Sequence, residues 1–483
     1  GIKFSATVPQ DPFLGKALSL AVDKPVSLAL GLEADISRAI QMYARQSDEE
    51  GDIDAEDMFG GQSDDEFIEH LKDLASEAPV IRLVNQIIHT AVDLGASDIH
   101  IEPFDDGLQL RYRVDGVLQD AADFPPANLA PAIASRVKLL SQMNIAERRL
   151  PQDGRIMTRV KGHEIDLRVS TIPTVHGESI VMRVLDRDSI RLSLISMGFS
   201  EDTLARYQEL LASPHGVLLL TGPTGSGKTT TLYASLASLD SDRLKIITVE
   251  DPVEYQLRGV NQIQVQSQID LTFARVLRAI LRQDPDIIMI GEMRDTETAQ
   301  IAVQSALTGH LVLSTLHTNT AAGAITRLED MGVERYLITS SVNGVLAQRL
   351  VRTLCKKCKL AVDLSVEEIE HSGLAPFVGD TKIVYEATGC EACSGTGYSG
   401  RVAIHELFPL DEEMHRVILS GADATVLHAA ARKQGMITLY EDGLRKVVEG
   451  VTSMQEVMRV TQDQGEVQMA AEEAPSAEAP VVA

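Results

Sequence analysis

Positions 222–229 read Gly222-Pro223-Thr224-Gly225-Ser226-Gly227-Lys228-Thr229, the most informative segment of the chain. It has the GxxxxGK[ST] pattern of a phosphate-binding loop. An apolar run precedes it and a helical pattern follows, which is the order that such a loop requires. We therefore predict that its glycines let several backbone N–H groups face the phosphates of a nucleotide. Lys228 is expected to reach the β and γ phosphates, and Thr229 to bind Mg²⁺.

Around this loop, short apolar runs alternate with helical patterns. The runs that predict buried strands are 217–221, 245–249, 287–290 and 311–314. Buried strands that alternate with helices favour a mostly parallel sheet with helices on both faces. The sequence therefore predicts an α/β nucleotide-binding domain.

A different pattern precedes this domain. Residues 98–102 and 108–114 alternate between apolar and polar, and Asp115-Gly116 supplies a hairpin turn after the second run. A helical pattern at 131–143 is followed by more alternating segments, which include 164–169 and 179–185. This region is expected to form a small α+β domain.

Two groups of acids follow predicted strands beside the phosphate loop. Glu292 comes after the strand that ends at Ile290, while Glu250 and Glu254 follow the strand that ends at Val249. Parallel strands bring such positions to the ligand-binding edge of a sheet. We predict that Glu292 activates water, with Glu250 and Glu254 around the metal and water. The alternative is that they are solvated loop acids.

Two histidines flank the strand at 311–314. His310 precedes it and is interpreted as a structural residue of the core. His317 follows it at the ligand edge, where it could sense the γ-phosphate, although a packing role is equally compatible with its position.

The four cysteines form two CxxC pairs, separated by 31 residues, and they are all the cysteines of the chain: Cys355, Cys358, Cys390 and Cys393. Two such pairs supply four thiolates to a tetrahedral Zn²⁺ with no open position, which is typical of a structural site. A redox pair or free buried thiols are the alternatives.

Composition limits the class of protein further. The 483 residues are 44% hydrophobic with a net charge of −26. Segments 48–77 and 461–483 carry −12 and −5 of this charge, so the remainder is only mildly acidic. No basic stripe suited to nucleic acid is present. Because no secretory signal and no spanning apolar run are evident, we expect a cytoplasmic protein.

Four segments together resemble the secretion-ATPase superfamily of type II secretion and type IV pilus motors. They are the phosphate loop, the acidic box at 250–254, the Gly-Glu strand end at 291–292 and the histidine box at 308–318. The resemblance covers about residues 65–460 and includes 96–103, 111–116 and 151–155. Segments 301–310 and 344–350 look closest to the type II secretion assembly ATPases. The cysteine module supports assembly over retraction, because the retraction branch of the superfamily lacks it.

This resemblance implies a RecA-like P-loop ATPase domain, a preceding PAS-like α+β domain and a C-terminal zinc module. It also implies that arginines of the preceding domain approach the nucleotide as fingers when that domain closes. The candidates are Arg111, Arg113, Arg168 and Arg183. Without the resemblance, these would be interpreted as ordinary strand arginines that face solvent.

The implied domain organisation follows the chain. A remnant of an N-terminal docking domain is expected at 1–46 and an acidic linker at 47–66. The α+β domain occupies 67–190, and the ATPase domain 197–460 includes the zinc module at 350–405. A disordered tail is expected at 461–483.

The function implied is that of a homo-hexameric motor that hydrolyses ATP with Mg²⁺ to drive pseudopilus assembly and protein export. It would lie at the cytoplasmic face of the inner membrane, bound through the platform proteins of the secretion system and not to nucleic acid. Type IV pilus extension or competence is the alternative with the same chemistry. A nucleotide-dependent switch without turnover is a third hypothesis.

Overall fold

The computed structural model describes the backbone of strands 2–6 and 26–30, and residues 78–122, 124–186, 192–378 and 382–461. The chain divides into two units, Gly1–Leu74 and Ala75–Ala483. In the first, β1 (Ile2–Ala6) and β2 (Val26–Leu30) pair in parallel. The rest of the predicted docking remnant, the acidic linker at 47–66 and the tail after Thr461 lie outside the described residues.

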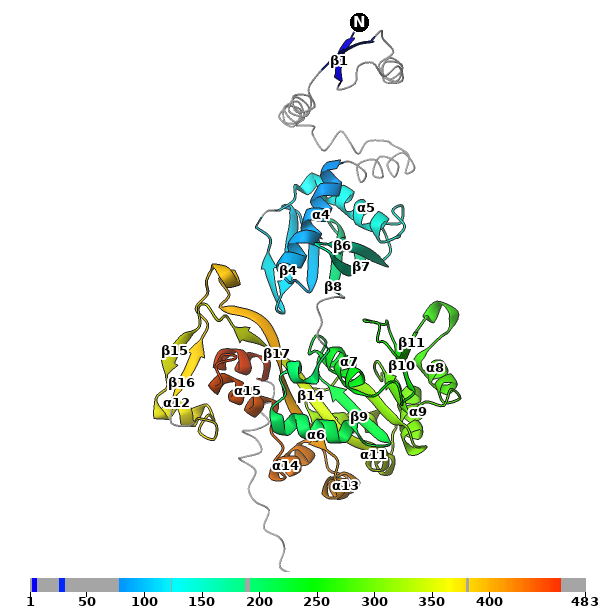
Figure 1. Cartoon of the computed structure of the whole chain (residues 1–483), viewed down its shortest axis with the longest axis vertical. Coiled ribbons are helices and arrows are strands. Elements are labelled where there is room, and N and C mark those ends of the chain that lie inside the picture. The colour runs from blue at the N-terminus through cyan, green and yellow to red at the C-terminus, as the bar shows by residue number, and fades with distance from the viewer. Residues whose placement is uncertain are drawn as a thin grey trace, which may run out of the picture. The chain divides into compact units, whose positions relative to one another are not determined.

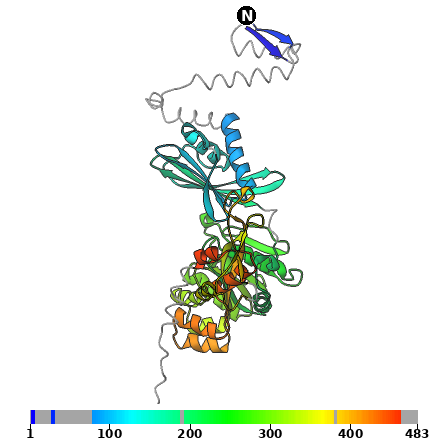
Figure 2. The same ribbon diagram turned by 90° about the vertical axis from the view of Figure 1, so that its left-hand side faces the viewer.

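Within the second unit, a six-stranded sheet of the order β5-β4-β3-β8-β7-β6 comes first. All of its strand pairs are antiparallel. Its strands are β3 (Asp98–Pro103), β4 (Leu108–Val114), β5 (Val117–Asp120), β6 (Gln152–Val160), β7 (His163–Thr174) and β8 (Gly177–Asp186). Helices α4 (Ala78–Asp93) and α5 (Ala130–Leu140) lie side by side on this sheet (Figure 1, Figure 2).

A second sheet of seven strands carries the phosphate loop. Its order is β11-β10-β12-β13-β9-β14-β17, and every pair is parallel except β14 with β17. The strands are β9 (Gly216–Thr221), β10 (Ile246–Glu250), β11 (Val260–Gln264), β12 (Ile287–Ile290), β13 (Leu311–Leu316), β14 (Val342–Leu354) and β17 (Tyr398–Pro409).

Successive side chains of its central strands point into two separate apolar cores. For example, Leu218 and Leu220 belong to one core, whereas Val217 and Leu219 belong to the other. This is why the strands read as continuous apolar runs, since both faces are covered by helices. The first core is closed by α6 (Glu201–Leu211) and α7 (Lys228–Ser238). The second is closed by α8 (Phe273–Ile280), α9 (Thr296–Leu307), α10 (Ala321–Asp330) and the C-terminal helices.

The cysteine module lies between β14 and β17 in the sequence. It contains the antiparallel pair β15 (Leu360–Asp363) and β16 (Ile383–Glu386) and the short helix α12 (Val366–His371). After β17 come α13 (Glu412–Leu419), α14 (Ala424–Lys433) and α15 (Leu439–Val448), and helix α11 (Arg335–Ser341) precedes β14. In the part of the chain that the structure describes, no helix has the length and apolar character needed to cross a bilayer.

The predicted fold class is confirmed: an α/β fold built on a mostly parallel sheet, with a preceding α+β domain and a module of four clustered cysteines. The predicted strands and the helix after the loop appear at the expected positions. The exact domain boundaries stay a prediction.

Candidate functional site

The phosphate loop joins the carboxyl end of β9 to the first turn of α7 (Figure 1). Gly225 and Gly227 have φ angles of 81° and 86°, a region that favours glycine. Gly227 is also the residue immediately before the helix, so the loop's N–H groups and the helix N-terminus share one location. Thr229 lies exposed in the first helical turn. This geometry is suited to binding a chain of phosphates.

Lys228 folds back over its own loop. Its Nζ donates hydrogen bonds to the carbonyl oxygens of Gly222 and Pro223, at 2.7 and 3.0 Å. Burial lowers the pKa of Lys228 to about 8; the nearby Glu292 carboxylate opposes this shift, and Arg349 adds to it. An anionic phosphate beside the amine would restore its usual pKa, which makes Lys228 responsive to the ligand.

A buried glutamine on β14 forms hydrogen bonds that hold the phosphate loop against the sheet. The Nε2 of Gln348 donates to the Ser226 carbonyl oxygen, and its Oε1 accepts from the Thr231 hydroxyl, both at 2.8 Å. Gln348 is 1% exposed, so these contacts fix the position of the loop against the sheet. Gln348 lies within segment 344–350, which resembles the secretion ATPases, but no local sequence pattern predicts this supporting role.

Glu292 lies just after β12, at the same edge of the sheet as the loop. Its carboxylate forms an ion pair with Arg294, and its Oε2 is 3.5 Å from the Nε2 of His317. The structure thus brings together the predicted water activator and the histidine that follows β13. His310 does not join them, because its Nδ1 lies 2.8 Å from the Ser305 carbonyl oxygen at the opposite end of the strand.

Glu250, at the end of β10, faces inward. It is 3% exposed and accepts hydrogen bonds from Thr248 Oγ1 at 2.5 Å, from Gln262 Nε2 at 3.1 Å and from the hydroxyl of Tyr233. Burial raises the pKa of Tyr233, as do the Glu250 charge and the hydrogen bond to it, so the phenol stays a donor. These donors hold the Glu250 carboxylate against the sheet in this structure.

Glu254 lies farther along the same loop and pairs with an arginine of the six-stranded sheet. Arg168 donates from Nη1 and Nη2 to the two carboxylate oxygens, at 3.0 and 2.5 Å. Such a bidentate pair is geometrically specific. One of the four predicted fingers therefore contacts the acidic box directly.

The other three predicted fingers pair within their own sheet. Arg183 donates from Nε to Asp98 at 3.2 Å, Arg113 lies 3.8 Å from the same carboxylate, and Arg111 pairs with Glu102. The strand register places five charged residues directly opposite one another in one row across the sheet: Arg113, Asp98, Arg183, Arg168 and Arg155. Arg111 is not in this row, because it pairs opposite His100.

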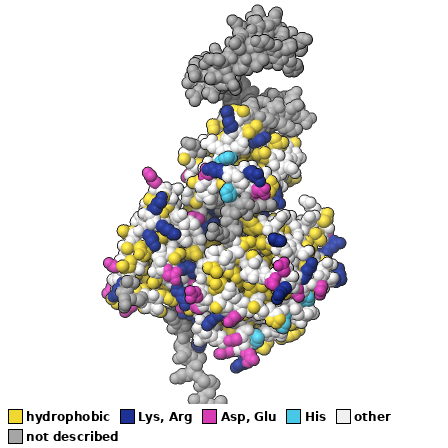
Figure 3. Space-filling view, in the orientation of Figure 1, with side chains coloured by type: hydrophobic (Ala, Val, Ile, Leu, Met, Phe, Trp, Pro, Cys, Tyr) yellow, Lys and Arg dark blue, Asp and Glu magenta, His cyan; other side chains and the backbone are white. Residues whose placement is uncertain are grey.

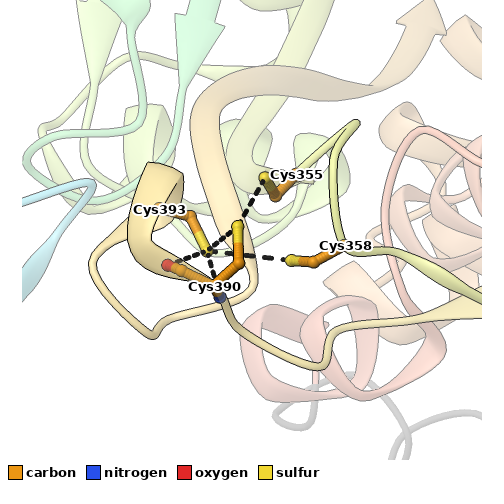
Figure 4. A group of neighbouring side chains, drawn as sticks. All are labelled: Cys355, Cys358, Cys390 and Cys393. Atoms are coloured by element: carbon orange, nitrogen blue, oxygen red, sulfur yellow. Dashed lines mark hydrogen bonds between the residues drawn. The ribbon is translucent and has the colours of Figure 1, made fainter.

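The four cysteines gather at one point, as predicted (Figure 4). The Sγ–Sγ distances are 3.9 Å for Cys355–Cys390, 3.8 Å for Cys358–Cys393 and 3.7 Å for Cys390–Cys393. Four sulfurs about 2.3 Å from a tetrahedral Zn²⁺ would lie about 3.8 Å from one another. The spacing of the thiols therefore fits a zinc ion and is too long for disulfides.

The phosphate loop forms one wall of a cavity of about 350 Å³. The lining residues are Pro223, Thr224, Gly225, Ser226, Arg349, Leu350, Arg459 and Val460. Two of them are arginines, so the cavity favours an anionic ligand. Elsewhere, on the face shown in Figure 3, basic and acidic side chains are interspersed and form no basic stripe.

Comparison with known proteins agrees with this geometry. The family model described as "Type II/IV secretion system protein" matches residues 73–459. A similar curated protein is the type II secretion system protein E of Xanthomonas campestris pv. campestris, 54% identical over 94% of this chain and 80% of its own length. The type II secretion system ATPase E of Vibrio cholerae is 48% identical over 88% of this chain and 85% of its own length.

Solved structures are more distant in sequence. The pilus retraction motor PilT, with ADP bound, is 25% identical, with a TM-score of 0.53 over 80% of this chain and 98% of its own. The ATPase DotB of Legionella pneumophila, 23% identical, has a TM-score of 0.57 over 79% of this chain and 95% of its own. The latter likeness shows the fold.

Proposed function

Because this chain belongs to the Type II/IV secretion system protein family, we propose that it is the ATPase motor that drives pseudopilus assembly and protein export in type II secretion. The family match includes all the predicted nucleotide-site residues and all four cysteines. Relatives that are about half identical over most of the chain are named as type II secretion proteins, which supports type II secretion as the system that this motor drives.

The observation that carries the hydrolytic function is the position of Glu292. Its carboxylate lies at the carboxyl edge of the sheet, beside His317 and close enough to Lys228 to affect its titration. A carboxylate fixed at this edge can orient a water molecule and accept its proton. His317 is suited to holding Glu292 and sensing the γ-phosphate, because its Nε2 lies 3.5 Å from that carboxylate and its side chain is 48% exposed.

The phosphates of ATP would be held by the N–H groups of the loop and by Lys228. Thr229 would hold Mg²⁺, with Glu250 and Glu254 around the metal and water, a role that stays a prediction for both acids. The metal supplies charge neutralisation on the β and γ phosphates. Of the arginine fingers, Arg168 is favoured, because it already lies at the acidic box.

The cysteine module is proposed to bind Zn²⁺ as a structural ion. All four positions of a tetrahedral site would be filled by thiolates, which leaves none for substrate. The metal would join the two CxxC pairs, residues 355–358 and 390–393, which lie at the two ends of the module.

For the assembly, we propose a homo-hexamer at the cytoplasmic face of the inner membrane, bound there through platform proteins of the secretion system. The names of the relatives support a partner in that machinery. No role in binding nucleic acid is proposed.

Substitution of Lys228 and Glu292 tests this function. Lys228→Ala should abolish ATP binding, whereas Glu292→Gln should bind ATP and lose turnover by about a hundredfold or more. Glu297→Gln is the matched control, because Glu297 lies nearby on α9 and pairs with Arg278 at the surface. Light scattering with and without nucleotide measures the molar mass of the assembly and therefore tests whether a hexamer forms.

Wild-type protein that binds ATP without turnover, in any assembly state, would favour the switch hypothesis. Equal stimulation of turnover by pilus and secretion platform proteins would remove the preference for secretion over pilus extension or competence.

A further inference from the structure

The last described helix, residues 454–461, reaches the cavity beside the phosphate loop. Arg459 and Val460 form part of the cavity wall, together with residues 223–226 of the loop. Arg459 is 230 residues beyond the last residue of the loop in the sequence, and no motif marks it. The fold nevertheless brings Arg459 to the wall of the same cavity as residues of the loop that would hold phosphate.

Arg459 is held in a defined orientation by one carboxylate. Its Nε and Nη2 donate to Glu456 at 2.8 and 2.6 Å. Among the described residues, its third nitrogen, Nη1, has no hydrogen-bond partner. The Arg459 side chain is 51% exposed although its partner Glu456 is fully buried, so the guanidinium is anchored at one end and accessible at the other.

Glu456 is itself fixed by a second arginine. The backbone N–H and the Nη2 of Arg352, on β14, donate to its two oxygens at 3.0 and 2.7 Å. Burial by itself would raise the pKa of Glu456, but the hydrogen bonds from Arg459 and Arg352 outweigh it and keep the pKa below its ordinary value. The carboxylate therefore stays charged and can hold Arg459.

The cavity contains a second feature that points to a ligand. Ser226, in the loop, is only 3% exposed. Its hydroxyl oxygen is buried and has no hydrogen-bond partner among the described residues. Buried hydroxyls are normally satisfied, so this oxygen is suited to a hydrogen bond with a bound molecule. With Arg349 and Arg459 in the same wall, the complementary molecule is an anion.

We propose that Arg459 contacts the polyphosphate of the bound nucleotide, and that Glu456 is the positioning residue that directs it there. This inference rests on the proposed function, since it assumes that ATP binds at the phosphate loop. Arg459 would thus join the C-terminal helix to the ligand, and nucleotide binding would depend on a segment far from the phosphate loop in the sequence.

The experiment uses the full chain and two probes, MgATP and inorganic tripolyphosphate, which has no base or ribose. Arg459→Ala should weaken both by the same factor, roughly ten- to hundredfold, as expected for the loss of a charged hydrogen bond. Glu456→Gln should weaken both less, and should have little further effect when combined with Arg459→Ala. Arg459→Lys should recover part of the affinity, because it keeps the charge.

Arg432→Ala is the matched control. Arg432 donates to Glu441 at 2.6 Å in the same C-terminal region and does not line the cavity. An equal loss in this control would overturn the inference, as would unchanged binding in Arg459→Ala. Weaker ATP binding with unchanged tripolyphosphate binding would also overturn it, because the contact would then be with the base or ribose. Wild-type protein that binds neither probe would overturn the proposed function, and the inference with it.

Discussion

Arg168 and Glu254 form a bidentate ion pair, with N–O distances of 3.0 and 2.5 Å, between the six-stranded sheet and the loop that follows β10. Both side chains are 23% exposed. A guanidinium in this position is already paired with the acidic box and has to exchange that partner for a phosphate if it is to act as a finger.

We therefore expect Arg168→Ala to lower kcat by about a thousandfold with little change in KM, since a finger acts mainly in the transition state. Arg168→Lys should not restore activity, because an ammonium cannot reproduce the planar fork. Steady-state ATPase assays measure both constants. Arg159→Ala is a suitable control, as Arg159 pairs with Glu164 at the surface of the same sheet. A normal kcat in Arg168→Ala would assign the finger to another residue.

Replacement of a single cysteine should remove the metal. Cys390→Ser leaves three thiolates, so the bound zinc measured by elemental analysis should fall from about one per chain to well below one. Proteolysis within 350–405 should become faster in the same variant. Ser394→Ala, one residue from Cys393, should keep its zinc. The structural site would be contradicted if the purified wild-type protein contained no zinc and added zinc did not slow proteolysis within 350–405.

The affinity for ATP should depend on pH through Lys228. The free protein has a Lys228 pKa of about 8, and a phosphate neighbour would raise it. Binding therefore takes up a proton above pH 8, and the affinity should fall as pH rises from 8 to 10. Calorimetry in buffers of different ionisation enthalpy measures that proton. Lys228→Arg, which stays charged, should bind with a flatter pH profile, and an equally steep profile would exclude Lys228 as the cause.

A buried histidine should make the fold less stable in acid. His405 is 2% exposed and stacks on Phe199, with ring centroids 3.8 Å apart. Burial lowers its pKa well below 6.5, and Lys446 adds to this effect. The unfolded chain then binds a proton that the folded chain does not, so stability is full above about pH 6.5 and decreases below it. The slope should be about 1.4 kcal/mol per pH unit.

Denaturant titrations at pH 5.5 and 7.5 measure this loss. His405→Phe should remove this part of the pH dependence, because phenylalanine can stack in the same place without titrating. His371→Phe, at an exposed position, should leave it unchanged. The same pH dependence in all three proteins would rule out His405 as its origin.

Local patterns predicted much of this molecule. The loop sequence, the apolar runs around it and the acids after them follow rules of short range, and they placed Glu292 and His317 at one edge of the sheet. The CxxC pairs indicated the cysteine cluster in the same way. Alternation predicted β4, and the strand register then aligned Arg113 with Arg183 and Arg168 across the sheet.

Other features depend on contacts between distant segments, which no local pattern reveals. The sequence predicts the same role for Glu250 and Glu254, yet Tyr233 and Gln262 hold Glu250 inside the fold. Gln348 supports the loop from a strand, 122 residues farther along the chain than the Ser226 that it contacts. Strand β17 joins the sheet only after the chain has passed through the cysteine module, so its antiparallel pairing with β14 depends on a long excursion of the chain.

That pairing has a mechanical consequence. The strands β14 and β17 pair from Gly344 and Pro409 to Leu354 and Tyr398, next to the cysteines, with one shift of register between Arg352 and Leu354. A load applied to the module would therefore pass along two hydrogen-bonded strands into the sheet that carries the phosphate loop. If a partner docks on the module, a force that it exerts there would be transmitted to the phosphate loop.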